Sequence, residues 1–199
     1  MKYIFLFITI SFLFACKHLQ DHFTHAVTPS SLIVEATDPS LSFKNGYWYY
    51  AGNLFTGTII EHYNSTTIHQ STQYVNGKEN GWRITYYLNG DLSEKRFYTN
   101  GEKDNVHTGW WQKGNKRFEY HFTNGIYNGD YREWYQSGRL LKHIHYTNDM
   151  DDWGKGWRES GKLYMNYVMK EGRRYGIVNS NLCYTVKNDK GEYINSSPN

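Results

Sequence analysis

The sequence predicts an all-β protein, an elongated antiparallel meander of stacked β-hairpin repeats of about 24 residues each. Two series of glycines carry this prediction, and large aromatic residues recur at fixed offsets from both. A fixed period indicates an architecture in which each unit packs against its neighbours. The first series is Gly77, Gly101 and Gly125, with Asp149 and Gly172 in the next two slots, and the second is Gly90, Gly114, Gly138 and Gly161.

A single repeat shows why each unit should be a hairpin. Residues 82–88 are rich in aromatic and β-branched types, which are typical of strands, and a second strand-like run covers 92–98. Asn89-Gly90 separates the two runs and favours a type I′ turn, because both central residues of that turn need a positive φ. Asn100-Gly101 then leads into the next unit, so consecutive hairpins should form a meander.

The period also predicts which side chains stack. Residues at equivalent places in successive repeats are expected to form ladders across the sheet. The expected ladders are Tyr86, Trp110, Trp134 and Trp157, and Tyr98, Phe122 and Tyr146. Apolar and polar residues alternate in the second strand of most repeats, which predicts one apolar and one polar face. Residues 45–50 are expected to form the strand that starts the sheet.

The composition agrees with a sheet stabilised by aromatic rings. Aromatic residues make up 18% of the 199-residue chain, so buried area must come largely from rings. The three prolines, Pro29, Pro39 and Pro198, lie outside the repeats, as expected because proline removes a hydrogen-bond donor from a sheet. The formal net charge is +3 without a basic block, which argues against a nucleic-acid partner.

The N-terminus resembles the signal of a bacterial lipoprotein. Lys2 supplies a positive charge, residues 3–14 are an apolar run too short to span a bilayer, and Leu13-Phe14-Ala15-Cys16 resembles a lipobox. Cleavage before Cys16 would leave a lipid-modified cysteine that anchors the mature chain to a membrane of the cell envelope, outside the cytoplasm. The alternative is a plain secretory signal, or an anchor, with an incidental cysteine.

These observations divide the chain into four parts. The predicted parts are a lipoprotein signal peptide (1–15), a tether (16–40), the β-hairpin repeats (41–176) and a C-terminal cap or tail (177–199).

The repeats resemble the MORN-repeat variant family, a group often labelled YwqK-type antitoxin proteins. The shared pattern is Y/F-x-N-G-x(3)-G followed by W/Y-Y-x-x-G-x-L, which occurs in residues 74–92 and 122–140, with looser copies over roughly 41–176. The resemblance implies an elongated sheet of stacked hairpins and an interaction or scaffold function without catalysis. The antitoxin label fits an exported chain poorly, because such a chain is badly placed to neutralise a cytoplasmic toxin.

Few residues in the sequence suggest site chemistry. His121, His143 and His145 are expected on one polar face, with His121 and His145 one period apart and therefore neighbours, and three imidazoles could bind zinc or copper. The alternative is a solvated face that tolerates histidine. Cys183 is an unpaired thiol once Cys16 carries a lipid; it is either a reactive thiol activated by Arg173 or Arg174, or a small buried hydrophobe.

The sequence therefore predicts a non-enzymatic lipoprotein that acts as a protein-binding scaffold at the cell envelope. No catalytic residue and no cofactor is predicted, because no nucleophile, phosphate-binding or dinucleotide-binding motif occurs. Two alternatives stay open: a metal- or thiol-handling envelope protein, and a glycan-binding protein whose Tyr and Trp rings stack on sugars. The identity of the partner, the oligomeric state and the choice of inner or outer membrane stay open too.

Overall fold

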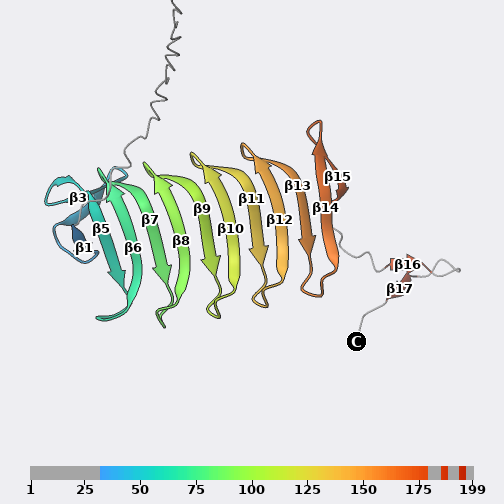
Figure 1. Cartoon of the computed structure of the whole chain (residues 1–199), viewed down its shortest axis with the longest axis horizontal. Coiled ribbons are helices and arrows are strands. Elements are labelled where there is room, and N and C mark those ends of the chain that lie inside the picture. The colour runs from blue at the N-terminus through green and yellow to red at the C-terminus, as the bar shows by residue number, and fades with distance from the viewer. Residues whose placement is uncertain (1–31, 179–184, 188–192, 196–199) are drawn as a thin grey trace, which may run out of the picture.

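The computed structural model describes residues 32–178, 185–187 and 193–195, which form strands and turns and no helix (Figure 1). Within these residues no helix is long and apolar enough to cross a membrane. The predicted signal peptide with Cys16, and Cys183, lie outside them. The strands are β1 (Ile33–Glu35), β2 (Leu41–Lys44), β3 (Tyr47–Tyr50), β4 (Asn53–Leu54), β5 (Gly57–His62), β6 (Ile68–Val75), β7 (Lys78–Tyr86), β8 (Leu92–Thr99), β9 (Glu102–Trp110), β10 (Lys116–Thr123), β11 (Ile126–Trp134), β12 (Leu140–Thr147), β13 (Met150–Trp157), β14 (Leu163–Lys170), β15 (Arg173–Ile177), β16 (Thr185–Lys187) and β17 (Tyr193–Asn195).

The predicted meander is confirmed. One sheet of twelve strands runs in the order β1-β5-β6-β7-β8-β9-β10-β11-β12-β13-β14-β15, and every pair from β5 onward is antiparallel. Figure 1 shows the hairpins side by side, with their turns in two rows along opposite margins of the sheet. Within this sheet, β1 departs from the predicted meander, because it pairs with β5 in parallel. Ile33–Glu35 therefore belongs to the sheet, although it falls within the predicted tether.

Residues 45–50 do not start the main sheet, and this prediction is wrong. They form part of a separate three-stranded sheet, β2-β3-β4, which packs over the first strands of the main sheet. Phe55, only 1% exposed, anchors this packing together with Val34, Ile59 and Tyr74. The small sheet thus caps the N-terminal end of the array and buries apolar surface that an ordinary repeat would leave for its neighbour.

The two glycine series serve two kinds of turn. Asn100-Gly101 and Asn124-Gly125 have positive φ at both residues, as a two-residue type I′ turn requires. The predicted type I′ turn at Asn89-Gly90 is wrong, because only Gly90 has a positive φ, of 85°. There the chain makes a longer turn, closed by hydrogen bonds from Gly90 N to Tyr87 O (2.9 Å) and from Tyr87 N to Asp91 O (2.8 Å).

The predicted ring ladders are not continuous. One repeat contains two strands, so equivalent residues lie about 9.6 Å apart with another strand between them. Tyr98, Phe122 and Tyr146 are therefore linked through rings of the intervening strands, His107 and Tyr127, with centroid separations of 4.6–5.2 Å. Among the described residues, Tyr86, Trp110, Trp134 and Trp157 make no ring contact with one another.

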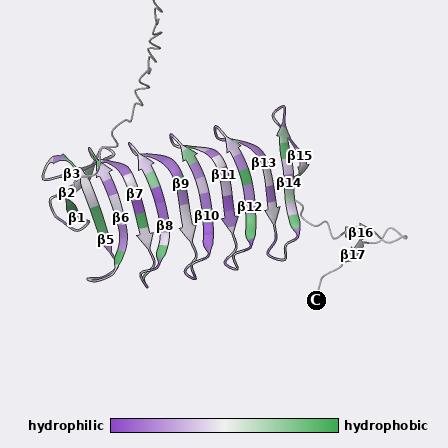
Figure 2. Cartoon of the chain, viewed as in Figure 1, coloured by the Kyte–Doolittle hydropathy of each residue, from purple (hydrophilic) through white to green (hydrophobic). Residues whose placement is uncertain are grey.

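The two sides of the sheet differ in character. The aromatic face is the side that carries Tyr98, His107, Phe122, Tyr127 and Tyr146. The charged face is the opposite side, which carries Glu119, Asp130, Arg132, His143 and His145. Figure 2 shows hydrophilic and hydrophobic residues mixed along the strands, as expected when successive side chains point to opposite faces.

Side chains on the aromatic face are buried by lying over glycines. The Phe118 ring covers Gly109, its partner in β9, and a Cβ on Gly109 would collide with that ring. The Tyr167 ring covers Gly154 in the same way, and a Cβ there would come within 2.6 Å of it. Phe118 is 6% exposed and Tyr167 4% exposed, although no second layer formed by the described residues covers them. The sheet therefore hides its large rings in space that the neighbouring strand leaves free.

Hydrogen bonds from each hairpin to the next fix the register of the array. At one margin, Gly101 N donates to Glu79 O (2.7 Å) and Gly125 N to Lys103 O (2.8 Å). At the other margin, an aromatic side chain reaches the next repeat. These bonds are Tyr63 Oη to Tyr86 O, Tyr87 Oη to Trp110 O, Trp111 Nε1 to Trp134 O and Tyr135 Oη to Trp157 O, at 2.7–3.1 Å.

The packing of Phe118 over Gly109 predicts the effect of a single methyl group. Gly109→Ala should destabilise the protein by about 1–3 kcal/mol in urea denaturation, because the methyl forces the ring away from β9. Replacing the Phe118 ring with a smaller side chain should relieve the collision. The double variant Gly109→Ala with Phe118→Leu should therefore lose less stability than the sum of the two single losses. Additive losses would contradict the packing described.

Candidate functional site on the charged face

Two of the three predicted histidines share one carboxylate. His143 and His145 lie two residues apart on β12, so both project from the charged face, opposite Asp130 on β11. The Asp130 Oδ1 atom accepts hydrogen bonds from His143 Nε2 and His145 Nδ1, both at 3.0 Å. The indole of Trp153 on β13 contacts both imidazoles, with the His145 ring stacked parallel to it. The two rings are held in place from both neighbouring strands.

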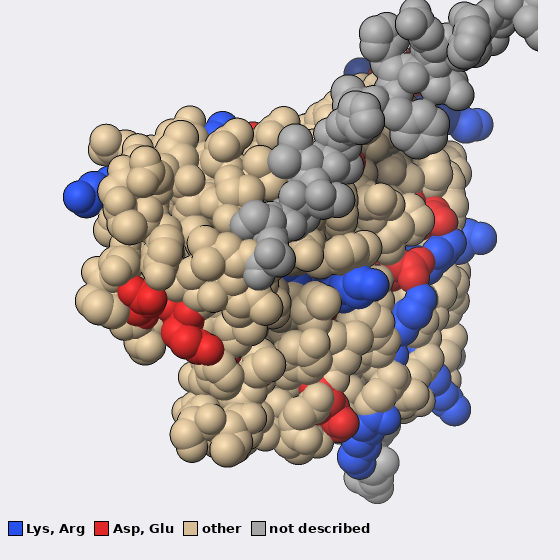
Figure 3. Space-filling view, turned by 60° about the vertical axis from the view of Figure 1, so that its left-hand side comes forward, with Lys and Arg blue, Asp and Glu red and all other residues tan. Residues whose placement is uncertain are grey.

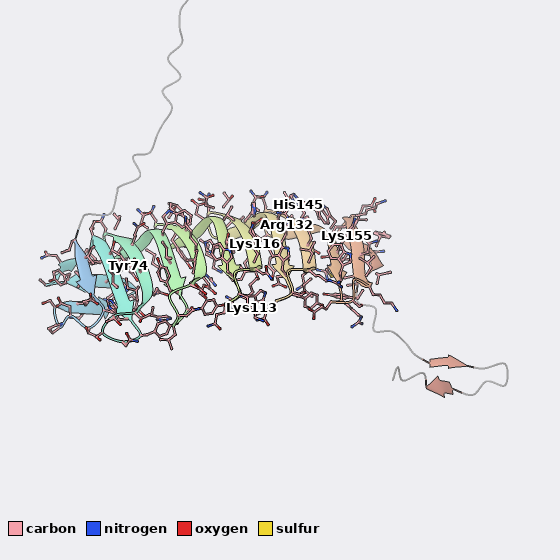
Figure 4. All side chains as sticks on the ribbon, turned by 60° about the horizontal axis from the view of Figure 1, so that its bottom comes forward. Tyr74, Lys113, Lys116, Arg132, His145 and Lys155 are labelled. Carbon is pink, nitrogen blue, oxygen red and sulfur yellow. The ribbon has the colours of Figure 1, made fainter. Side chains whose placement is uncertain are left out.

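Arg132 extends this cluster to β10. Its Nη2 atom donates to Asp130, and its Nη1 atom donates to Glu119 Oε1 at 2.9 Å. Glu119 also accepts from Lys116. Figure 4 places Arg132 and His145 close together on the sheet, with Lys155 on the neighbouring strand β13. The result is a row of alternating positive and negative groups across β10 and β11, which meets the two imidazoles of β12 at Asp130.

The pKa values of both carboxyl groups are lowered by this arrangement. Burial alone would raise the pKa of Asp130, but the hydrogen bonds from His143 and His145 and the charge of Arg132 outweigh it and lower the pKa to about 2. For Glu119, burial again acts upward, and the contacts with Lys116 and Arg132 lower the pKa overall. Both groups therefore stay ionised at neutral pH and serve as fixed acceptors.

His121 does not join the other two histidines, so the prediction that His121 and His145 are neighbours is wrong. His121 lies on β10, and β11 separates it from β12. Its Nε2 atom is buried without a hydrogen-bond partner and lies 3.6 Å from Glu119 Oε1. In the described part of the chain, no group of three or more His, Cys, Asp or Glu residues is arranged to hold a metal ion.

The other predicted candidate is Cys183, which lies outside the described residues. The two arginines expected to activate it can still be placed, on the edge strand β15. Arg174 forms an ion pair with Asp151, with Nη2 3.0 Å from Oδ2, and its guanidinium lies over the Tyr167 ring. Arg173 is exposed. One of the two arginines is therefore engaged in holding β15 to the sheet.

The aromatic face also carries a polar cluster that the sequence did not predict. Glu133 Oε1 accepts hydrogen bonds from Tyr120 Oη (2.8 Å) and Tyr131 Oη (2.6 Å), and Glu133 Oε2 lies 3.2 Å from Lys142 Nζ. Burial raises the pKa of both tyrosines, and their hydrogen bonds help to lower the pKa of Glu133 against the effect of its own burial. Both phenols remain protonated, so the cluster holds the rings in place.

His107 was also missed, and it is the most buried histidine of the described residues, at 1% exposure. Its ring lies between Tyr98 and Phe122, and Nε2 donates to Phe97 O at 2.8 Å. Burial lowers the pKa of His107 to about 4, against the effect of this hydrogen bond. The sequence contains only one sign that His107 is buried. The equivalent residue in the next repeat is an aromatic residue, Tyr131.

No protein-family model matches the chain, and no curated protein matches it either. Figure 3 shows Lys and Arg side chains along one margin of the molecule with Asp and Glu among them, so the visible surface has mixed charge. On the charged face, the described residues offer fixed hydrogen-bond donors and acceptors.

The pKa of Asp130 predicts how the stability lost on replacing this residue depends on pH. Because the folded-state pKa of about 2 lies below the usual 3.8, ionised Asp130 stabilises the fold above about pH 4, and this stabilisation is lost as the pH falls through 2. Asp130→Asn should cost about 1 kcal/mol at pH 7 in urea denaturation, and the difference should vanish between pH 4 and pH 2. The exposed turn residue Glu159 supplies the control Glu159→Gln, which should show no such loss. A cost that is constant with pH would contradict the assignment.

The buried imidazole of His107 predicts a second loss of stability on acidification, at higher pH than that of Asp130. The unfolded chain takes up a proton near pH 6.5, whereas the folded chain does so only near pH 4, so stability should fall as the pH drops between these values. His107→Phe should remove this part of the pH dependence, measured as urea midpoints from pH 7 to pH 4. The half-exposed His69 supplies a control, His69→Gln, which should keep the wild-type slope. An unchanged slope in His107→Phe would overturn the prediction.

Proposed function

We propose that this chain is a non-enzymatic scaffold of the bacterial cell envelope, anchored by a lipid on Cys16, and that its charged face binds a protein partner. The observation that carries the proposal is the ordered row of charges across β10 and β11, in which Arg132 bridges Glu119 and Asp130. Charges that are already fixed lose little freedom on binding, and complementary charges steer association and set specificity.

The architecture supports the same proposal. The main sheet is one layer thick over its central hairpins, and repeat sheets of this kind present extended binding surfaces. Lys155 on β13 lies opposite His143 and is exposed, and among the described residues it makes no hydrogen bond or ion pair. It is therefore a free positive charge beside the fixed row, available to an acidic group of a partner. The resemblance to MORN-repeat variants also favours interaction over catalysis.

Charge reversal at Lys155 tests the proposal. Full-length chain would be purified from detergent-solubilised membranes, and co-purifying proteins would be quantified by mass spectrometry. Lys155→Glu should reduce recovery of a specific partner about tenfold, because a like charge then faces the partner's acidic group. Lys162→Glu, an exposed reversal in the turn between β13 and β14 and off the charged face, is the matched control and should leave recovery unchanged. Equal recovery with both variants would contradict binding by the charged face.

The anchor is tested separately in the same cells. Cys16→Ser should move the chain from the membrane fraction to the soluble extracytoplasmic fraction, because the variant cannot carry the lipid. Retention in the membrane fraction would contradict the proposed attachment and leave the test of the charged face unaffected.

A further inference from the structure

Two open grooves lie along one row of hairpin turns, at the margin of the main sheet. They separate the turns at residues 63–67, 87–91 and 111–115, which form part of the lower margin in Figure 1. The first groove is lined by Thr66, Thr67, Ile68, Tyr86, Leu88, Asn89 and Gly90. The second is lined by Asp91, Leu92, Trp110, Gln112, Lys113 and Gly114, each 24 residues after a member of the first. These rim grooves are therefore the same site in two successive repeats.

Each rim groove combines one aromatic ring with hydrogen-bonding groups. Tyr86 and Trp110 are half-buried and occupy equivalent places, with Leu88 beside Tyr86 exposed at 62%. Sugars present an apolar C–H face together with a rim of hydroxyls, so a ring flanked by amide and hydroxyl side chains is chemically complementary to them. The polar side chains are Thr66, Thr67 and Asn89 in the first groove, and Asp91, Gln112 and Lys113 in the second.

The charges of the rim grooves favour an uncharged ligand. The first groove is lined by no charged residue, and the second contains one acid and one base, Asp91 and Lys113, whose formal charges cancel. Figure 4 shows Lys113 on the margin of the molecule, apart from Arg132 and His145. The rim therefore lacks the fixed ionic groups of the charged face, and hydrogen bonding must supply specificity.

The spacing of the rim grooves favours an extended polymer over a peptide. Successive grooves are one hairpin apart, about 9.6 Å, which is two interstrand distances. A β-1,4-linked polysaccharide turns the same face of its sugar outward once per disaccharide, a repeat of similar length. An extended peptide repeats its side-chain direction about every 6.6 Å and does not keep this period.

The same turn position is bridged in the following repeats. Asn115 Nδ2 donates to Gln136 O at 3.0 Å, and Arg139 Nη1 donates to Glu159 O at 2.7 Å, so both side chains cross to the next turn. Asp91, which holds the equivalent place, accepts a hydrogen bond from Asn89 Nδ2 within its own turn, at 2.7 Å. The second rim groove is open because this side chain does not cross.

We propose that the two rim grooves bind one extended, uncharged, β-1,4-linked polysaccharide chain, with one disaccharide per hairpin. Tyr86 and Trp110 stack on sugar rings, and the amide and hydroxyl side chains bind the sugar hydroxyls. None of the charged residues proposed above to bind a protein lines these grooves, so this proposal does not depend on that one.

Titration calorimetry with two probes tests the proposal, using the full-length chain in detergent. Cellohexaose and its N-acetylated counterpart chitohexaose share the backbone geometry and distinguish a glucan from an aminoglycan. One of them should bind about 100-fold more tightly than its own disaccharide, because the hexamer occupies both grooves at once. A neutral Ser/Gln peptide of matching length should not bind. Failure of both hexamers, or binding of the peptide alone, would overturn the proposal.

Variants assign any binding to the rim. Trp110→Ala should weaken hexasaccharide binding about tenfold, whereas Trp157→Ala, at the same repeat position beyond the open grooves, should not. Asp91→Arg places an arginine at the turn position where Arg139 reaches across to the next turn. The new side chain should close the second groove while both aromatic rings remain. This variant therefore tests the site even if Trp110→Ala does not fold. Affinity that is unchanged in a folded Trp110→Ala or in Asp91→Arg would refute the site. Lys155→Glu should leave sugar binding intact, which separates this proposal from the protein-binding one.

Discussion

The structure depends on the hydrogen bonds that pass from each hairpin to the next. A one-layer sheet has no second layer to cover it, so an ordinary core cannot hold its repeats in register. Bonds such as Gly101 N to Glu79 O at one margin and Tyr87 Oη to Trp110 O at the other recur with the period of the sequence. Because the hairpins are tied at both margins, each repeat positions the next, and stability builds up from neighbouring pairs.

The aromatic residues take the place of a core within this frame. Phe118 lies over Gly109 and Tyr167 over Gly154, so these rings are buried by the backbone of the neighbouring strand rather than by a facing layer. The buried imidazole of His107 continues the row of rings between Tyr98 and Phe122. One side of the sheet is therefore committed to its own packing, which leaves the charged face and the turn margins for contacts with other molecules.

The fold class could be predicted because turn chemistry is local: Asn-Gly tolerates positive φ wherever it stands. Which side chains are neighbours could not be predicted in the same way. One sequence period contains two strands, so His121 and His145 are separated by β11, the strand that carries Asp130. Residues 45–50 have the same turn signal as the repeats, yet they form a capping sheet. The contacts of Glu133 and His107 depend on strand register, which shifts at bulges such as the one before Phe118 and leaves no mark in the periodicity.

In a repeat array, a binding site arises where equivalent positions differ. Asp91, Asn115 and Arg139 hold one place in three turns, and only the last two reach across to the next turn. A difference of one side chain therefore decides whether a groove between turns stays open, although the backbone is nearly the same in each repeat. The regular residues explain how the sheet holds together, and the irregular ones mark the surface at which we propose that another molecule binds.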